Sequence, residues 1–415
     1  MINYHNVTFR NHPIIYNACS LIMACSLILS TRSIWLSTIN GAHFGNFIYW
    51  ALIFSGGILI LNVKSIDKNI FKRYFLSYFL ITIYILIYTL LPDNRSSIFN
   101  IFKLYFGFTI IYFYFVFYSK EDSLPLMLKY YINFMCVIGI VSLFFWSLGS
   151  VFHFIKPTGT TISYWADERG VACNSYYGIY FETQSLAPNV IRNSAIFSEA
   201  PMSAINFLIA LALQNLYNAD DKMHRFKEII LILSVLSTTS TTGYIGVLII
   251  YVLRYLLSAI NQKNVLRIII FISIGIVGLI IIHILFTQKL DGISGEIRLD
   301  DYKAGIKAWQ LYPIFGSGYN SMLFQQFISS WRNDNIGFSN TLMNILVDGG
   351  IYLLIPYAYV LCRAIFNTLK RGKKTTFIFS ILVAFMFTTT ILTNTYILLF
   401  LFIFIYFYGD SEYKL

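Results

Sequence analysis

Apolar stretches long enough to cross a bilayer recur along the whole of this 415-residue chain. A hydrocarbon core of about 30 Å requires about 20 apolar residues per helix. The stretches are continuous rather than alternating, which excludes a transmembrane β-barrel. Charged residues make up only 12% of the chain, about half of what a soluble globular protein carries. The class that remains is an all-α, polytopic integral membrane protein, with residues 1–415 forming a single membrane domain.

The apolar windows predict about 12 transmembrane helices. The windows that meet at Thr242 and at Leu392 are short, so each pair is either a tight helical hairpin or one kinked helix. The first window is expected to be a retained helix rather than a signal peptide, because Met23 stands where cleavage requires a small residue and Arg32 follows closely. The windows are 14–30, 44–62, 74–91, 101–118, 130–148, 195–216, 229–241, 243–258, 268–286, 339–362, 375–391 and 393–408.

The distribution of Lys and Arg predicts the orientation, because basic loops stay on the cytoplasmic side of a membrane. With the N-terminus inside, the loops on the cytoplasmic side together contain the whole formal net charge of +11. Both termini are then cytoplasmic. The basic composition is explained by topology, so no nucleic-acid partner is expected.

Two connections, 149–194 and 287–338, are much longer than the others, and on this topology both are periplasmic. Long loops in a compact protein are usually functional. The second contains Leu299, Tyr302, Ile306 and Trp309 at helical spacing, which predicts an amphipathic helix over 295–312 that lies either on the membrane interface or against the bundle. The first contains Cys173, the only cysteine in a polar loop, so no disulfide framework is expected.

Four arginines in these loops are candidate ligands for a diphosphate, since a guanidinium group matches phosphate oxygens bidentately and stays charged. They are Arg169, Arg192, Arg298 and Arg332. A salt bridge with a neighbouring acid is the alternative for each. Asp348 lies nine residues into a predicted span, where a charge is costly, so it is expected to face the bundle interior or a watery cavity. No His or Cys cluster has metal-ligand spacing, and no metal is expected.

Three motifs, in their order along the chain, resemble the O-antigen polymerase and ligase superfamily. The first is the helix entry from Arg192 to Pro201, and the second is Arg298 followed by Trp309, Pro313 and a Gly-Ser-Gly turn at 316–318. The third is the helix start at 339–344 that continues to Asp-Gly-Gly at 348–350. The motifs cover roughly residues 190–360, and the topology agrees over the whole chain.

The resemblance implies a GT-C-like glycosyltransferase of the bacterial inner membrane that needs no cofactor. Polymerases of this superfamily join oligosaccharide repeat units carried on undecaprenyl diphosphate at the periplasmic face, and loop arginines engage the diphosphates. Arg192 and Arg298 match that role, and Arg169, Arg332, Ser339, Asn340 and Asp348 are the further substrate-binding candidates. Expected partners are the lipid-linked oligosaccharides, membrane lipid and a chain-length regulator protein.

The sequence departs from the superfamily's ligases at Ser339, where they carry a histidine before the asparagine. A serine cannot act as the imidazole base, which favours a polymerase over a ligase. Glu199 becomes the first candidate for the base; alternatively, it pairs with an arginine or caps a helix. Besides a ligase, a lipid-linked oligosaccharide flippase or another transporter remains an alternative.

Overall fold

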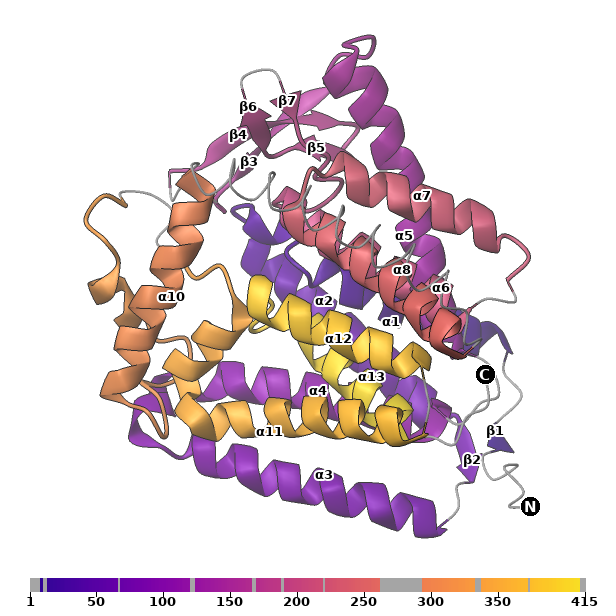
Figure 1. The fold of residues 1–415 in the computed structure, drawn as a ribbon, viewed down its shortest axis with the longest axis vertical. Helices are drawn as coiled ribbons and strands as arrows, with labels where there is room; N and C mark the ends of the chain where they lie inside the picture. The colour runs from indigo at the N-terminus through magenta and orange to yellow at the C-terminus, as the bar shows by residue number, and fades with distance from the viewer. Residues whose placement is uncertain are drawn as a thin grey trace.

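The computed structural model describes residues 8–9, 13–65, 68–119, 124–165, 169–187, 190–218, 221–261, 293–332, 337–371 and 374–410. Within these ranges the chain is a helical bundle with a small β-structured region at one end (Figure 1). The α-helices are α1 (Pro13–Leu29), α2 (Gly41–Leu61), α3 (Lys68–Thr89), α4 (Ile98–Tyr118), α5 (Leu126–Phe145), α6 (Ala200–Tyr217), α7 (His224–Ser237), α8 (Thr241–Asn261), α10 (Ile293–Leu311), α11 (Thr341–Arg371), α12 (Lys374–Thr389) and α13 (Tyr396–Asp410).

Every predicted span that falls within the described residues is a helix, and the window 268–286 lies outside them. Seven of the described helices are long and apolar enough to cross a membrane, while α1, α12 and α13 are apolar but shorter. These helices fit an integral membrane protein. The windows that meet at Thr242 and at Leu392 form separate helices joined by short turns rather than single kinked elements.

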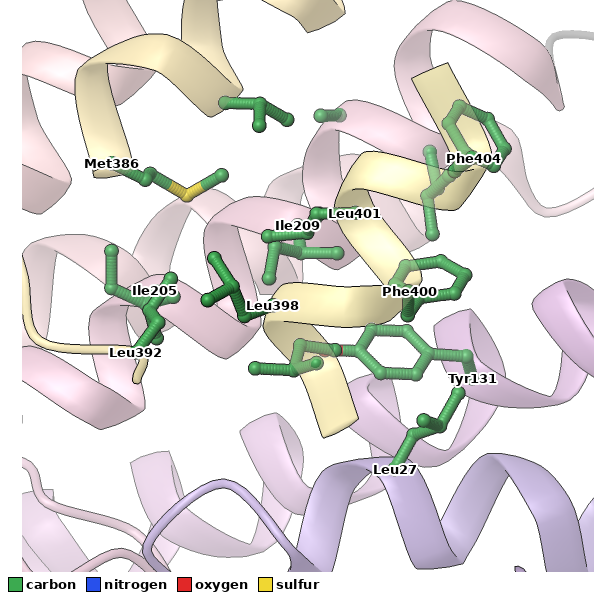
Figure 2. Close-up of a cluster of buried hydrophobic side chains, with 14 of the residues drawn as sticks. Leu27, Tyr131, Ile205, Ile209, Met386, Leu392, Leu398, Phe400, Leu401 and Phe404 are labelled. Atoms are coloured by element: carbon green, nitrogen blue, oxygen red, sulfur yellow. The ribbon is translucent and has the colours of Figure 1, made fainter. Parts of the chain in front are cut away.

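The centre of the bundle is α6, whose residues are almost all buried. A helix that is apolar on every side is stable only when other helices surround it. Figure 2 shows side chains from its neighbours converging on it, with Leu27 of α1, Tyr131 of α5 and Phe400 of α13 around Ile205 and Ile209. Because α6 is fixed on all sides, the segment that leads into it is held in place as well.

The first long connection contains β-structure that the sequence analysis did not predict. β3 (Gly159–Ser163), β4 (Val171–Tyr176) and β5 (Tyr180–Glu182) form an antiparallel sheet, and β6 (Ser185–Ala187) pairs with β7 (Val190–Ile191). Tyr176 and Tyr180 pack against Phe145 at the end of α5, which attaches the sheet to the bundle. Cys173 lies buried in β4, and burial raises the pKa of its thiol.

The predicted amphipathic helix is α10, but only part of the predicted face is buried, since Tyr302 and Trp309 pack against the core. Ala304 and Ala308 are buried and Tyr302 donates a hydrogen bond to the Thr388 carbonyl, so α10 packs against the bundle. Leu299 and Ile306, which the spacing placed on the packed face, are exposed. Small residues allow close helix approach, and the spacing of large apolar residues therefore missed the part of the contact face that Ala304 and Ala308 form.

The strands β3 to β7 and α10 lie toward one end of the bundle, and the short strands β1 (Thr8–Phe9) and β2 (Val63–Ser65) lie toward the other (Figure 1). The helices reverse direction at short turns, so the ends of α1, α5 and α7 and the starts of α2, α6 and α8 meet at the end that carries the strands. This shared end contains the candidate site.

Candidate functional site

The segment 192–199 runs alongside the end of α1 before α6 begins. The Ile34 amide donates to the Ile196 carbonyl at 2.9 Å, and the Ser198 amide donates to the Arg32 carbonyl at 2.9 Å. Ser33 and Phe197 form an antiparallel bridge between the two segments. Residues 195 and 196 form a turn in which the Phe197 amide donates to the Ser194 carbonyl, and these contacts hold the segment outside the helix, so α6 starts at Ala200 rather than at 195 as predicted.

Glu199 is fixed at the start of α6 by an ion pair with Arg32. The distance from Arg32 Nη1 to Glu199 Oε1 is 3.0 Å, and the two side chains are 18% and 16% exposed, so ligands can still reach them. Glu199 occupies the N-cap position in an extended conformation, but its side chain makes no capping hydrogen bond. Of the alternatives left open by the sequence, the structure therefore has Glu199 paired with an arginine, and not capping the helix.

Arg32 also stacks on an aromatic ring of the first long connection. Its guanidinium carbon lies 4.0 Å from the centroid of the Trp165 ring. Burial lowers the pKa of Arg32, and the hydrogen-bonded ion pair with Glu199 opposes this effect. An arginine retains its charge in such surroundings. The stack and the ion pair together fix the orientation of the guanidinium plane.

Arg192 is oriented by the turn between α7 and α8. Its Nε donates to the Thr238 carbonyl and to Thr239 Oγ1, both at 3.0 Å, and Thr239 has a positive φ of 50°. Nη1 lies 3.4 Å from Gln184 Oε1, which also accepts the Ala200 amide at 3.0 Å. The backbone turn and an amide side chain, rather than an acid, hold this guanidinium group.

Arg298 in α10 completes a group of three arginines around one carboxylate. Arg192 and Arg298 both interact electrostatically with Glu199. Arg298 also interacts with Asp301, and it disfavours the charge of Arg192. Burial lowers the pKa of each of these two arginines, and Glu199 partly reverses the shift. Within the described part of the chain, neither forms an ion pair with a carboxylate at bonding distance. We call Arg32, Arg192, Arg298 and Glu199 the arginine cluster.

Arg332, in contrast, is committed to acidic partners. Its Nη1 lies 2.6 Å from Asp301 Oδ1 and 3.3 Å from Asp300 Oδ2, and its side chain is fully buried. Burial raises the pKa of Asp301, although its bonds with Ser339 and Arg332 act in the other direction. The salt bridge that the sequence analysis kept as the alternative is therefore present at Arg332. Arg169 is exposed, and its acidic sequence neighbours lie outside the described residues.

Ser339 and Asn340 form the start of α11. The Ser339 amide donates to Asp301 Oδ2 at 2.9 Å, and Asn340 Oδ1 accepts the Met343 amide at 2.8 Å as an N-cap. The Asn340 Nδ2 amide group is buried and has no hydrogen-bond partner within the described residues. These contacts link the helix start to the buried ion pairs of Arg332.

Asp348 is buried in the bundle and binds a loop of its own chain. Its carboxylate accepts the backbone amides of Asn320 and Ser321 at 3.0 and 3.1 Å. The chain of α11 departs from helical geometry at Gly350, where the Ile351 amide bonds to the Pro313 carbonyl. These contacts give Asp348 a structural role in the described residues, holding the turn that follows α10 against the break in α11.

Two residues of this region were not predicted from the sequence as site residues: Arg32 of the arginine cluster, and Trp165, on which Arg32 stacks. The available signal for Arg32 was a cation directly after an apolar span, at the same membrane level as Arg192. Trp165 had no signal, because nothing in the sequence indicates that β3 approaches α1. No group of three or more potential metal ligands occurs in the residues that the structure describes.

Comparison with known families adds an independent observation about the second half of the chain. Residues 229–358 match the O-antigen ligase family model. This match supports the O-antigen polymerase and ligase superfamily, and it covers the turn that holds Arg192, together with Arg298 and the start of α11. It does not separate polymerases from ligases. No curated protein matches the chain.

Proposed function

We propose that this chain is a metal-independent glycosyltransferase that polymerises undecaprenyl-diphosphate-linked oligosaccharide repeat units into O-antigen or a related surface polysaccharide. The observation that carries the proposal is the convergence of Arg32, Arg192 and Arg298 on the single carboxylate of Glu199. The family match and the polytopic helical bundle support the same class of enzyme. The proposed location is the bacterial inner membrane, with the cluster on the periplasmic side and both termini in the cytoplasm.

The charge of the arginine cluster suits a diphosphate ligand. Glu199 balances only one of the three guanidinium groups, and Asp301, which also interacts with Arg298, is ion-paired with Arg332. The remaining positive charge suits an anionic ligand. Arg192 is already oriented by the α7–α8 turn, and a preorganised donor does not lose energy to reorientation when charge develops on a leaving group. Partial burial strengthens the interaction, because the effective dielectric constant is lower than in water.

The proposed reaction transfers the glycan from its lipid diphosphate to a hydroxyl group of a second lipid-linked unit. The acceptor oxygen attacks the anomeric carbon, the bond between that carbon and the diphosphate oxygen breaks, and the diphosphate leaves with the electron pair. The hydroxyl proton passes to Glu199, the proposed general base. Arg32 occupies Oε1 of Glu199, and Oε2 has no hydrogen-bond donor in the described part of the chain, so Oε2 is the proposed proton acceptor.

A ligase is the second candidate, because the matching family model describes O-antigen ligases. The donor chemistry would be the same, and only the acceptor would differ. Ser339 supports the polymerase, since its hydroxyl cannot replace an imidazole in proton transfer. Arg169, Arg332, Asn340 and Asp348 stay proposed substrate-binding residues of lower rank, because Arg332 and Asp348 already have partners within the protein. A chain-length regulator remains a proposed partner.

Gene deletion followed by gel analysis of the surface glycan tests the proposal. A polymerase deletion leaves one repeat unit on the lipid core and removes the long-chain ladder, whereas a ligase deletion removes every unit. A flippase or transporter is tested separately with purified protein in liposomes. Elongation of short lipid-linked repeats without movement across the bilayer would exclude it, whereas movement without elongation would contradict the proposal.

A further inference from the structure

A pocket of about 460 Å³ lies beside the arginine cluster and has no role in the reaction proposed above. Its volume falls within the range of small-molecule sites. Arg32 forms part of its wall, and so connects the pocket to Glu199. The other lining residues used below are Ser37, Ile39, Tyr164, Trp165 and Ser198. We call this space the Trp165 pocket.

Two segments far apart in the sequence build the Trp165 pocket. The short 3₁₀ helix Ile34–Ser37 follows α1, and β3 ends at Ser163. The Tyr164 amide donates to the Ser37 carbonyl at 2.7 Å, and the hydroxyl oxygens of Ser37 and Ser163 are 3.1 Å apart. These bonds hold the rings of Tyr164 and Trp165 next to the end of α1, so the pocket is part of the fold.

The lining of the pocket combines apolar ring surface with hydroxyl groups. Tyr164 and Trp165 are each 40% exposed, and Ile39 is 82% exposed at the rim. Ser37 and Ser198 supply hydroxyl oxygens, which donate to the Ile34 and Arg32 carbonyls and can still accept, and the lining residues that the structure describes include no acid. A pyranose ring has the matching chemistry, because its C–H bonds pack on aromatic rings while its hydroxyl groups bond to polar side chains at the edges.

Arg32 gives the pocket its donors. Its one side-chain hydrogen bond within the described residues uses Nη1, and a guanidinium group has five N–H donors. The ion pair with Glu199 balances its charge, and the stack on Trp165 fixes its plane. The remaining N–H groups therefore suit neutral hydroxyl acceptors better than a second anion.

We infer that the Trp165 pocket binds an uncharged pyranose ring of the lipid-linked glycan and holds it beside Glu199. This inference rests on the proposed function, because it assigns the pocket to a substrate of that reaction. The ring belongs either to the acceptor unit or to the growing donor chain. Both have the same chemistry, and separate kinetics for the two substrates distinguish them.

Three variants of the full-length protein in nanodiscs test the inference, together with one control. Trp165→Ala removes the ring, Trp165→Phe keeps a ring, and Ile39→Trp fills the pocket from an exposed position that tolerates a large side chain. Trp331→Ala is the matched control, because Trp331 is also exposed and does not line the pocket. The probe is the free oligosaccharide released by mild acid from the lipid-linked pool of the source cells.

Saturation-transfer NMR measures binding of this probe without requiring catalysis. The wild type, Trp165→Phe and the control should transfer saturation to the ring protons, while Trp165→Ala and Ile39→Trp should bind about tenfold more weakly, as expected for the loss of one aromatic contact. Wild-type affinity in both weakened variants would overturn the inference. If Trp165→Ala does not fold, the probe affinity of Ile39→Trp alone tests the inference.

Elongation kinetics then assign the ring and separate the two proposals. A raised KM for the acceptor alone places the acceptor sugar in the pocket, and a raised KM for the donor alone places the donor sugar there. If the variants weaken probe binding as expected but the wild-type protein shows no elongation activity, the proposed function is refuted and the assignment of the pocket is retained. Normal elongation and binding in the weakened variants would refute the pocket and retain the function.

Discussion

Arg32 donates a hydrogen bond to Glu199 across 167 residues of sequence, with 3.0 Å between Nη1 and Oε1. The pair joins the end of α1 to the start of α6, the helix at the centre of the bundle. Both side chains are mostly buried, so the loss of hydration offsets much of their attraction and the pair adds little net stability. Its importance is positional, since it orients Glu199 at the point where Arg192 and Arg298 also converge.

Glu199→Gln should reduce the rate of glycan elongation by about 10² to 10⁴. The amide oxygen can still accept the hydrogen bond of Arg32, but the side chain can no longer take a proton from the acceptor hydroxyl. Single-turnover elongation of lipid-linked repeats measures the effect. Glu296→Gln, an exposed acid of α10, is the control and should elongate normally. A wild-type rate for Glu199→Gln would remove Glu199 as the base.

Arg192→Lys and Arg298→Lys should each reduce elongation by about 10² or more, with protein levels unchanged. Lysine retains the charge but loses the planar fork of donors that binds a diphosphate bidentately. Glycan chain length on a gel and in-vitro elongation give the readout. Arg225→Lys, an exposed residue at the start of α7, is the control. Wild-type chain length from both site variants would refute the diphosphate assignment.

Arg332→Leu should lower the free energy of unfolding by about 3 to 5 kcal/mol, because it leaves the Asp301 and Asp300 carboxylates without their buried partner. The melting temperature in detergent measures this loss. Arg169→Leu, at an exposed position, should leave the melting temperature nearly unchanged. If Arg332→Leu melts like the wild type and yet fails to elongate glycan, Arg332 contacts substrate instead of stabilising the fold.

The apolar windows predicted the helices well because a membrane span requires a long continuous apolar run. The predicted helix ends were less accurate where tertiary contacts compete with helical hydrogen bonds. The apolar window continues to residue 195, but a turn at 195–196 and hydrogen bonds to Arg32 and Ile34 keep residues 195–199 out of α6. Similarly, the small residues Ala304 and Ala308 form part of the packed face of α10, and a pattern of large apolar side chains cannot indicate them.

The candidate site was only partly predictable for the same reason. Arg192 and Arg298 could be selected because each begins a motif of the superfamily. Arg332 could not be separated from them, since its acidic partners are 31 and 32 residues away in the sequence. Trp165 was missed, because its position depends on hydrogen bonds between β3 and the segment after α1. Long-range contacts of this kind leave no periodic signal.

The proposed orientation predicts which engineered cysteines react with a membrane-impermeant maleimide. In a Cys362→Ser background, Thr160→Cys in exposed β3 should react once the outer membrane is permeabilised. Arg225→Cys, on the proposed cytoplasmic side, should react only after the inner membrane is opened. Native Cys173 should not react, because it is buried in β4. Labelling of Arg225→Cys in cells with an intact inner membrane would contradict the proposed orientation and indicate the opposite one.

The last prediction concerns the turn that Asp348 holds. Gly316 has a positive φ of 70°, and an added Cβ would lie 2.4 Å from the Asp348 carbonyl carbon and from the Gly349 nitrogen.

Gly316→Ala should therefore lower stability by at least about 1 kcal/mol, because both the backbone conformation and the contact with α11 oppose a side chain. The melting temperature of the purified protein provides the measurement. Gly337→Ala is the control, since no atom of the described residues lies within 4 Å of a Cβ at that position. Equal melting temperatures for the two variants would show that the turn does not rest on the break in α11. The turn directly follows α10, which carries Arg298, so a displaced turn should also reduce elongation in Gly316→Ala.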